Sequence, residues 1–183
     1  MSSTGKILKL KTVFLMAALI INHFGAKAQD KNIVYIFLTE TCPICKSATV
    51  ELKKLNTEYS KQGYEFVGLF PNENLTTEAT RKAFSKKYKI DFNLIADTNQ
   101  QLTKQFNATI TPEVIVWNKT KQKIVYRGKI DNSFESVGKR RTITTEHYLR
   151  NAIESIQKNN SESITFTEPV GCFIQTKNQK HEN

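Results

Sequence analysis

The side chains of this chain that are best suited to chemistry are its three cysteines. Cys42 and Cys45 are separated by two residues, and Cys172 lies far away, near the C-terminus. A thiol pair at C-x-x-C spacing suits thiol–disulfide exchange, because the second sulfur can reach the first within one helical turn. Three cysteines are too few for a disulfide-stabilised scaffold. We therefore interpret Cys42 and Cys45 as a redox pair.

The pair lies where the sequence predicts a strand to end and a helix to begin. Ile33–Leu38 is a nearly continuous apolar run, typical of a strand buried on both faces. Pro43 fits the first turn of a helix, whose unpaired N–H groups and dipole favour a thiolate. Such sites lower the pKa of the first cysteine to about 3.5–7.5. We expect Cys42 to be the exposed nucleophile, and Cys45 to be shielded and to resolve the mixed disulfide.

Two other uses of the pair are weaker. A structural zinc site needs two further ligands, normally from a second close pair. A purely structural disulfide across C-x-x-C closes too small a loop to add much stability. Both alternatives stay open, and we expect no bound metal.

The remaining pattern alternates strands and helices and predicts an α/β fold. After a first helix that runs from Pro43 to about Ser60, we expect strands at Tyr64–Phe70, Phe92–Ala96, Val114–Trp117 and Lys123–Arg127, and helices from Thr76 or Thr77 to Tyr88, from Asp97 or Thr98 to about Phe106, and from Thr145 to about Lys158. This order implies a mostly parallel sheet covered by helices on both faces, with an antiparallel edge from the closing hairpin. We expect residues 131–144 to be a polar surface loop.

Residues 33–158 resemble the redoxin branch of the thioredoxin superfamily. The resemblance rests on Cys42-Pro-Ile-Cys45, on Ala108-Thr-Ile-Thr-Pro112-Glu113 and on Val125-Tyr-Arg-Gly-Lys-Ile-Asp131. It implies a thioredoxin-like fold with a central mixed five-stranded sheet, and the activity of an exported thiol–disulfide oxidoreductase that needs no cofactor. In such a fold the position of Pro112 holds a cis-proline that faces the cysteines. We therefore expect a cis bond after Thr111, and expect Thr111 and Pro112 to dock the partner chain, although most X-Pro bonds are trans.

The chain departs from thioredoxin at a buried position. Thioredoxin has an aspartate six residues before the first cysteine, and here that residue is Ile36. Glu40 or Glu113 is our substitute proton acceptor for Cys45, provided that burial raises its pKa toward neutrality. A solvated loop carboxylate is the competing interpretation for either residue.

A thiol peroxidase is the first alternative function. The peroxiredoxin pattern is Pro-x-x-x-Thr-x-x-Cys, which Thr39 and Cys42 match, whereas Tyr35 occupies the proline position. Arg127 would supply the positive charge that such a site needs. The peroxide site is thus incomplete in the sequence.

A copper-binding or copper-delivery module is the second alternative. Its thiolates would come from Cys42, Cys45 and Cys172, since soft sulfur ligands suit copper(I). Copper-delivery relatives use C-x-x-x-C with a histidine, and the spacing here is one residue shorter. This difference weighs against the copper role.

Cys172 lies in a short apolar island, Val170–Ile174, within a polar C-terminal end. We expect this island to pack against the domain. Cys172 is then either a small buried apolar residue or a third thiol near the site, able to resolve Cys42 or Cys45.

The N-terminus has the pattern of a cleavable bacterial signal peptide. Three lysines precede the apolar run Thr12–Ile21, and Ala26-Lys27-Ala28 follows it. The run is much shorter than the roughly 20 residues of a transmembrane helix. We expect a signal peptide at 1–28, a redoxin domain at 29–158, and a C-terminal extension at 159–183. The protein would be periplasmic or secreted.

The charge of the chain adds little to the prediction of its partners. The net charge is +10, with one dense basic patch at Lys139-Arg140-Arg141. Nucleic-acid binding would require a basic face with aromatic or helical readout, which the pattern lacks. We expect a monomer whose partners are protein thiols and disulfides and an upstream thiol reductant, for which a membrane-associated electron donor is one candidate.

Overall fold

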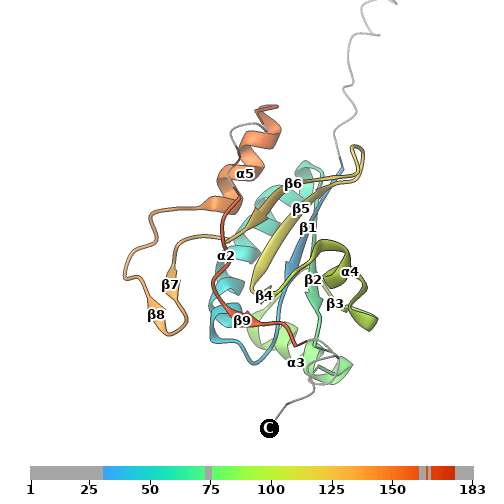
Figure 1. Cartoon of the computed structure of the whole chain (residues 1–183), viewed down its shortest axis with the longest axis vertical. Helices are drawn as coiled ribbons and strands as arrows, with labels where there is room; N and C mark the ends of the chain where they lie inside the picture. The colour runs from blue at the N-terminus through green and yellow to red at the C-terminus, as the bar shows by residue number, and fades with distance from the viewer. Residues whose placement is uncertain (1–30, 73–75, 161–163, 165, 176–183) are drawn as a thin grey trace, which may run out of the picture.

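The computed structural model describes residues 31–72, 76–160, 164 and 166–175 (Figure 1). Its central sheet has five strands in the order β3-β2-β1-β5-β6. Their bounds are β1 Asn32–Phe37, β2 Tyr64–Phe70, β3 Asn93–Ala96, β5 Glu113–Asn118 and β6 Lys123–Gly128. β2 is parallel to β1 and β3, and β5 is antiparallel to β1 and β6. This is the mixed five-stranded sheet that the sequence predicts.

Helices cover both faces of the sheet. They are α2 (Pro43–Tyr59), α3 (Glu78–Tyr88), α4 (Gln101–Phe106) and α5 (Tyr148–Gln157), with 3₁₀ turns η1 (Ser60–Gln62) and η2 (Thr98–Gln100). The buried side chains of α2, α3 and α5 share one core cluster, whereas those of α4 belong to a second cluster. Within the described ranges, no helix is both long and apolar enough to cross a membrane.

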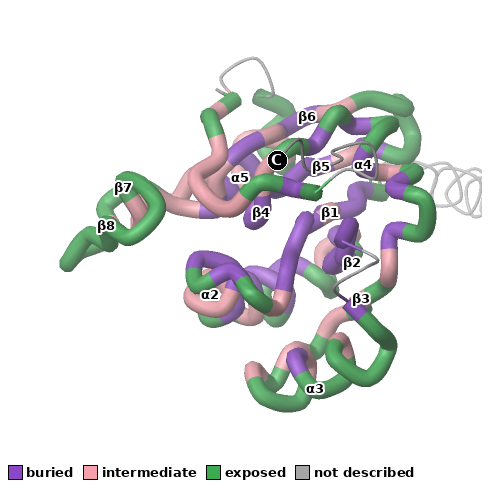
Figure 2. Tube along the Cα trace, turned by 60° about the horizontal axis from the view of Figure 1, so that its bottom comes forward, coloured by how far each residue is buried: buried purple, intermediate pink, exposed green. Residues whose placement is uncertain are grey.

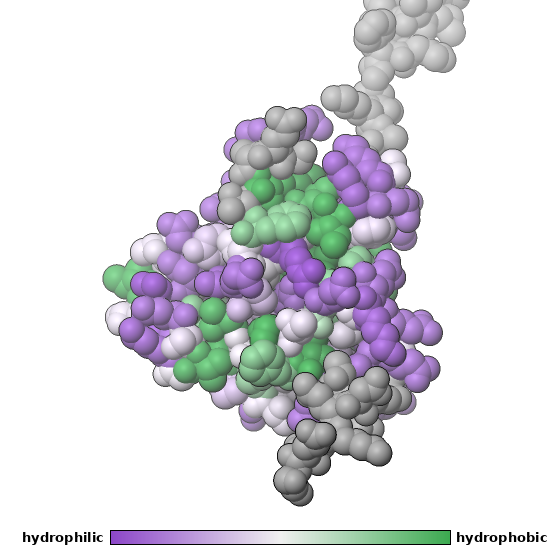
Figure 3. All heavy atoms as spheres, viewed as in Figure 1, coloured by the Kyte–Doolittle hydropathy of each residue, from purple (hydrophilic) through white to green (hydrophobic). Residues whose placement is uncertain are grey.

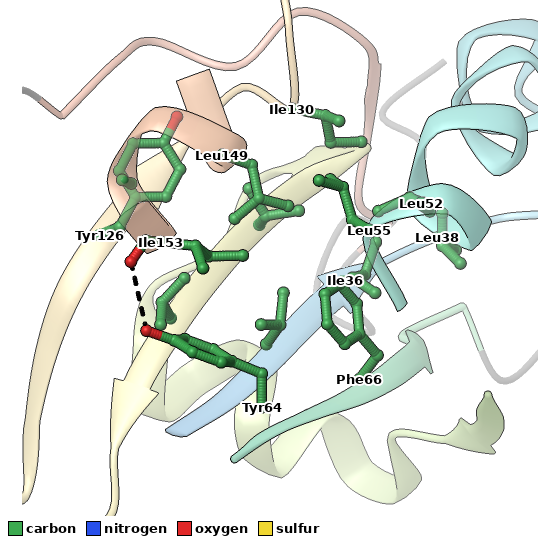
Figure 4. Packing of buried hydrophobic residues seen from close by; sticks show 14 of the residues in the cluster. Ile36, Leu38, Leu52, Leu55, Tyr64, Phe66, Tyr126, Ile130, Leu149 and Ile153 are labelled. Atoms are coloured by element: carbon green, nitrogen blue, oxygen red, sulfur yellow. Dashed lines mark hydrogen bonds between the residues drawn. The ribbon is translucent and has the colours of Figure 1, made fainter. Parts of the chain in front are cut away.

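Strand β1 is the centre of both cores. Ile36 packs toward α2 and α5, whereas Phe37 packs with the cluster on the α4 side. Figure 4 shows Leu52 and Leu55 of α2 and Leu149 and Ile153 of α5 converging on the sheet. Figure 2 shows buried backbone along β1 and on the inner side of α2. Burial on both faces fixes the end of β1, and thereby the start of α2.

Helices α4 and α5 begin at Gln101 and Tyr148, later than the sequence predicts, and in both cases a side chain that precedes the helix accepts from backbone N–H groups. For α4 that side chain is Asp97, one of the two residues expected to cap it. The Asp97 carboxylate accepts hydrogen bonds from the N–H groups of Leu102 and Thr103, at 2.9 and 2.7 Å, across the turn η2. Asn132 Oδ1 accepts from the N–H groups of Thr145 and Glu146, at 3.0 and 3.1 Å. These residues therefore precede α5 instead of opening it.

Four short strands were absent from the prediction. β7 (Phe134–Ser136) and β8 (Lys139–Arg140) pair as an exposed hairpin within the stretch expected to be a loop (Figure 2). β4 (Ile110–Thr111) pairs antiparallel with β9 (Cys172–Phe173). Strands of two or three residues are too short to show a period. The pairing of β9 confirms that the apolar island packs against the domain.

We expect Leu52→Ala to lower the free energy of unfolding by roughly 2–5 kcal/mol, because it empties a fully buried position. Val50→Ala on the same helix is the matched control. Val50 is 56% exposed, so its loss should stay within about 0.5 kcal/mol. Chemical denaturation measures both values. Equal losses would contradict the assignment of the buried face of α2.

Candidate active site

Cys42 is the N-cap of α2, directly after the loop that leaves β1. Its backbone is extended, with φ −73° and ψ 120°, and Pro43 occupies the first turn. The carbonyl of Cys42 accepts from the N–H of Lys46 at 3.1 Å, which closes that turn. The Cys42 sulfur thus lies at the positive end of a 17-residue helix.

Hydrogen bonds to its sulfur lower the pKa of Cys42 to about 5. The largest contribution comes from the Cys45 thiol. Burial opposes it, and the Cys172 thiol and the N–H groups of Cys45 and Ile44 add to it. Donors favour the charged form of an acceptor, so Cys42 is a thiolate at neutral pH.

Cys45 behaves in the opposite way. It is fully buried, and burial together with the neighbouring Cys42 sulfur raises its pKa well above the ordinary value. The backbone of Thr39 and the side chain of Thr111 act in the other direction but are outweighed. The pair therefore consists of one thiolate and one thiol that keeps its proton, as a nucleophile and a resolving partner require.

The expectation that Cys42 is exposed is wrong. The residue is 1% exposed. Its sulfur lies 2.9 Å from the sulfur of Cys172 and 3.4 Å from the carbonyl oxygen of Thr111, to which its thiol form donates. The C-terminal strand β9 brings Cys172 to the site, and sequence spacing alone did not show where the extension lies.

The Thr111–Pro112 peptide bond is cis, which confirms the prediction. Thr111 is fully buried, and it pairs with Cys172 in the β4–β9 ladder. Its hydroxyl donates to the carbonyl oxygen of Cys172 at 3.3 Å. Thr111 thus contacts both Cys42 and Cys172, and it joins the N-terminal and C-terminal parts of the site.

Glu113 is buried, but the structure places it away from the cysteines. It pairs in register with Phe37, whose side chain lies on the α4 side of the sheet, opposite to α2. Its carboxylate accepts from Nε of Arg127 at 2.5 Å, and burial raises its pKa despite this partner. The role of proton acceptor for Cys45 is therefore wrong for Glu113, because the residue after Pro112 faces the other core.

Glu40 stays a candidate for that role. It precedes Cys42 in the loop, and its Oε2 accepts from the hydroxyl of Thr76 at 2.7 Å. Its Oε1 is buried and has no hydrogen-bond partner among the described residues. A carboxylate oxygen with free acceptor capacity is thus held near the start of α2.

A groove runs beside the cysteine pair. Its lining includes Ile44 between the two cysteines, Pro112 after the cis bond, and Val170 from the C-terminal segment, together with Ile130 and Phe134. Figure 3 shows patches of apolar and of polar side chains on the face that carries β9. The groove thus offers apolar contacts beside polar ones to a side chain that flanks a reacting sulfur, and its polar lining comes from Lys129, Asp131 and Ser133.

Sequence reasoning missed two residues that hold the C-terminal segment in place. A Cβ atom at Gly171 would overlap the carbonyl oxygen of Thr111, so the two backbones touch. Thr167 Oγ1 accepts from the N–H of Lys129 at 2.8 Å, and the N–H of Thr167 donates to Arg127 O at 3.1 Å. In the sequence, Gly171 beside Cys172 could have indicated this close contact between two backbone segments.

The comparisons with known proteins agree with this geometry. The profile of the Redoxin family matches residues 17–140, which is more than half of the chain. No curated protein sequence matches the chain significantly. A hypothetical protein from Sinorhizobium meliloti 1021 superposes with a TM-score of 0.71 at 23% identity, covering 82% of both chains.

Two further solved structures are similar. An uncharacterised conserved protein from Geobacillus kaustophilus has a TM-score of 0.72 at 23% identity, covering 82% of this chain and 80% of that one. A provisionally named thiol:disulfide interchange protein DsbE from Chlorobium tepidum has a TM-score of 0.51 at 10% identity, covering 73% and 82%. These likenesses show a shared, thioredoxin-like fold.

A pH titration of the reduced protein tests the site. We expect one thiolate to appear through about pH 5, which its ultraviolet absorbance reports, while the other two thiols titrate well above neutrality. Cys45→Ala should raise the pKa of Cys42 more than Cys172→Ala does, because the Cys45 thiol is the larger cause of the low value. A first thiolate that forms near pH 9, the ordinary value, would contradict the assignment.

Proposed function

Because the chain belongs to the Redoxin family, we propose that it is an exported thiol–disulfide oxidoreductase that exchanges disulfides with partner proteins. One observation carries the proposal. The thiolate of Cys42 lies at the N-terminus of α2, beside the buried thiol of Cys45 and the cis bond before Pro112. This arrangement supplies a nucleophile, a resolving thiol and a docking backbone.

The exchange proceeds in two displacements. The Cys42 thiolate attacks one sulfur of a partner disulfide, and the second partner sulfur leaves as a thiolate that takes a proton. Cys45 then loses its proton and attacks the Cys42 sulfur, which releases the first partner sulfur as a thiol. The partner disulfide gains two electrons, and the Cys42–Cys45 pair gives them up. An upstream thiol reductant restores the pair.

Several residues would support these steps. Thr111 and Pro112 would dock the partner backbone beside Cys42, and the groove lined by Ile44 and Val170 would take an apolar side chain of the partner. Glu40 would accept the proton of Cys45. Each of these roles rests on position next to the pair.

The two alternative functions, a thiol peroxidase and a copper-binding module, stay predictions. Arg127, which a peroxide site would need, donates to Glu113 and to the carbonyls of Phe106 and Asn107. Among the described residues, no three His, Cys, Asp or Glu side chains form a group that could hold a metal ion. The cysteine variants below distinguish peroxide turnover from disulfide exchange.

The cellular setting belongs to the same proposal. The expected signal peptide, 1–28, lies outside the described residues. We propose that its removal leaves a monomeric redoxin domain with a C-terminal extension in the periplasm or outside the cell. The upstream reductant would then be a thiol protein of that compartment or of the membrane facing it.

We expect Cys42→Ser to abolish reduction of a protein disulfide such as that of insulin, because the thiolate is lost and the two remaining cysteines have raised pKa values. Cys45→Ser combined with Cys172→Ser should form a mixed disulfide with the substrate once and then stop, because no second thiol remains beside Cys42. Val50→Ser, on the exposed side of the same helix, is the control and should keep full turnover. Wild-type rates in Cys42→Ser would sink the proposal, and peroxide consumption that survives in Cys45→Ser would point to the peroxidase instead.

Processing of the N-terminus tests the proposed export. We expect the full chain, expressed in a bacterium and recovered from outside the cytoplasm, to begin at Gln29, because Ala26-Lys27-Ala28 presents small residues to a signal peptidase. Edman sequencing or intact mass measures this. Exported protein that still begins at Met1 would contradict cleavage.

A further inference from the structure

Strand β9 occupies the edge where a partner chain would have to lie. It pairs antiparallel with β4, opposing Cys172 to Thr111 and Phe173 to Ile110. Figure 1 shows β9 beside β4, near the N-terminal end of α2. Thr111 precedes the cis bond that faces Cys42, so the extension presents a cysteine in the place where the proposed function requires the sulfur of a partner.

Contacts on both sides of Cys172 hold it there. The N–H of Ile174 donates to Thr109 O at 2.8 Å, and the N–H of Gln175 donates to Asn72 Oδ1 at 3.0 Å. On the other side Gly171 touches the carbonyl of Thr111, and Thr167 is bonded to β6. The sulfur of Cys172 is thus fixed 2.9 Å from that of Cys42.

We propose that Cys172 is a third redox thiol, which β9 presents to Cys42 as a built-in substitute for the partner cysteine. In the oxidised protein the Cys172 thiolate attacks the Cys42 sulfur. A Cys42–Cys172 bond forms, the Cys42–Cys45 bond breaks, and Cys45 leaves as a thiolate that takes the proton lost by Cys172. The number of disulfides is unchanged, so the step needs no external oxidant or reductant.

The geometry selects Cys42 as the sulfur that is attacked. Cys45 is fully buried one turn inside α2, whereas Cys172 is partly exposed and contacts Cys42 directly. In the reduced protein the pKa of Cys172 is raised to about 11 by burial and by the hydrogen bond and negative charge of Cys42. The last two causes vanish when Cys42 is in a disulfide, so oxidation of the pair makes Cys172 a better nucleophile.

This inference rests on the proposed function, because it starts from the Cys42–Cys45 disulfide. It adds a consequence for partners. A partner chain has to displace β9 from β4 before it can reach Cys42, which is 1% exposed. The C-terminal extension would therefore control the access of a partner to Cys42. It would also determine whether the oxidised protein holds the Cys42–Cys45 or the Cys42–Cys172 disulfide.

The test equilibrates the full mature chain carrying Cys45→Ser with reduced and oxidised glutathione, followed by acid quenching, alkylation and mass mapping of unreduced peptides. Because β9 holds Cys172 against Cys42, its effective concentration should be millimolar or higher. At about 0.1 mM glutathione we expect the Cys42–Cys172 disulfide to exceed the Cys42–glutathione adduct by about tenfold or more.

Two variants in the Cys45→Ser background test whether the ratio depends on the contact between β9 and β4. Gly171→Ala places a methyl group against the Thr111 carbonyl, so it should push β9 away and lower that ratio by about tenfold. Phe173→Ala alters the next residue, whose side chain is 80% exposed, and should leave the ratio unchanged. Equal ratios in these two variants, or a ratio below one in Cys45→Ser itself, would overturn the proposal.

Two further measurements keep the outcome decisive. Should Cys45→Ser fail to fold, the oxidised wild-type chain takes its place. There a Cys42–Cys172 peptide beside the Cys42–Cys45 peptide supports the proposal, whereas its absence at every glutathione ratio, or a Cys45–Cys172 peptide instead, refutes it. Cys172→Ser should still form the Cys42–Cys45 disulfide. If it does not, the proposed function fails independently of the third thiol.

Discussion

The hydrogen bond from the Cys45 thiol to the Cys42 thiolate is the interaction on which the account of this protein depends. A buried negative charge without partners is too costly to persist. Here the N-terminus of α2, the Cys45 thiol and the Cys172 thiol share it, and the pKa of Cys42 falls to about 5. The same arrangement leaves Cys45 protonated. The pKa values of the two neighbouring cysteines thus differ because Cys42 lies at the start of α2, whereas Cys45 is buried one turn inside it.

The packing of the fold holds the N-terminus of α2 in place. β1 is buried on both faces, and α2 packs on it through fully buried leucines, so the loop between them has little freedom. β5 adds the cis bond at its start and brings Thr111 against the sulfurs. The C-terminal segment then closes the site from the edge of β4, which makes the extension part of the site instead of an appendage.

Strong local signals predicted most of the fold. The continuous apolar run of β1, the proline in the first turn of α2 and the periodic stripes of the longer helices all appear where expected. The prediction failed where a tertiary contact decides. Asn132 captures two N–H groups and delays α5, and the pairing of β9 with β4 buries Cys42. The prediction of Glu113 as the proton acceptor for Cys45 was wrong for a different reason. One residue of strand register puts its side chain on the opposite face of the sheet from the pair.

The reduction potential of the Cys42–Cys45 pair, measured in Cys172→Ser by equilibration with glutathione and alkylation trapping, tests the central claim most directly. A stabilised thiolate favours the dithiol form and makes the disulfide more oxidising. With all three cysteines present the pKa of Cys42 is about 5, which lies between those of thioredoxin and DsbA, and the Cys172 thiol is a smaller cause of this value than the Cys45 thiol. We therefore expect a two-electron potential between about −270 and −120 mV in Cys172→Ser as well. A potential below that of thioredoxin, or no disulfide between the two cysteines, would contradict the account.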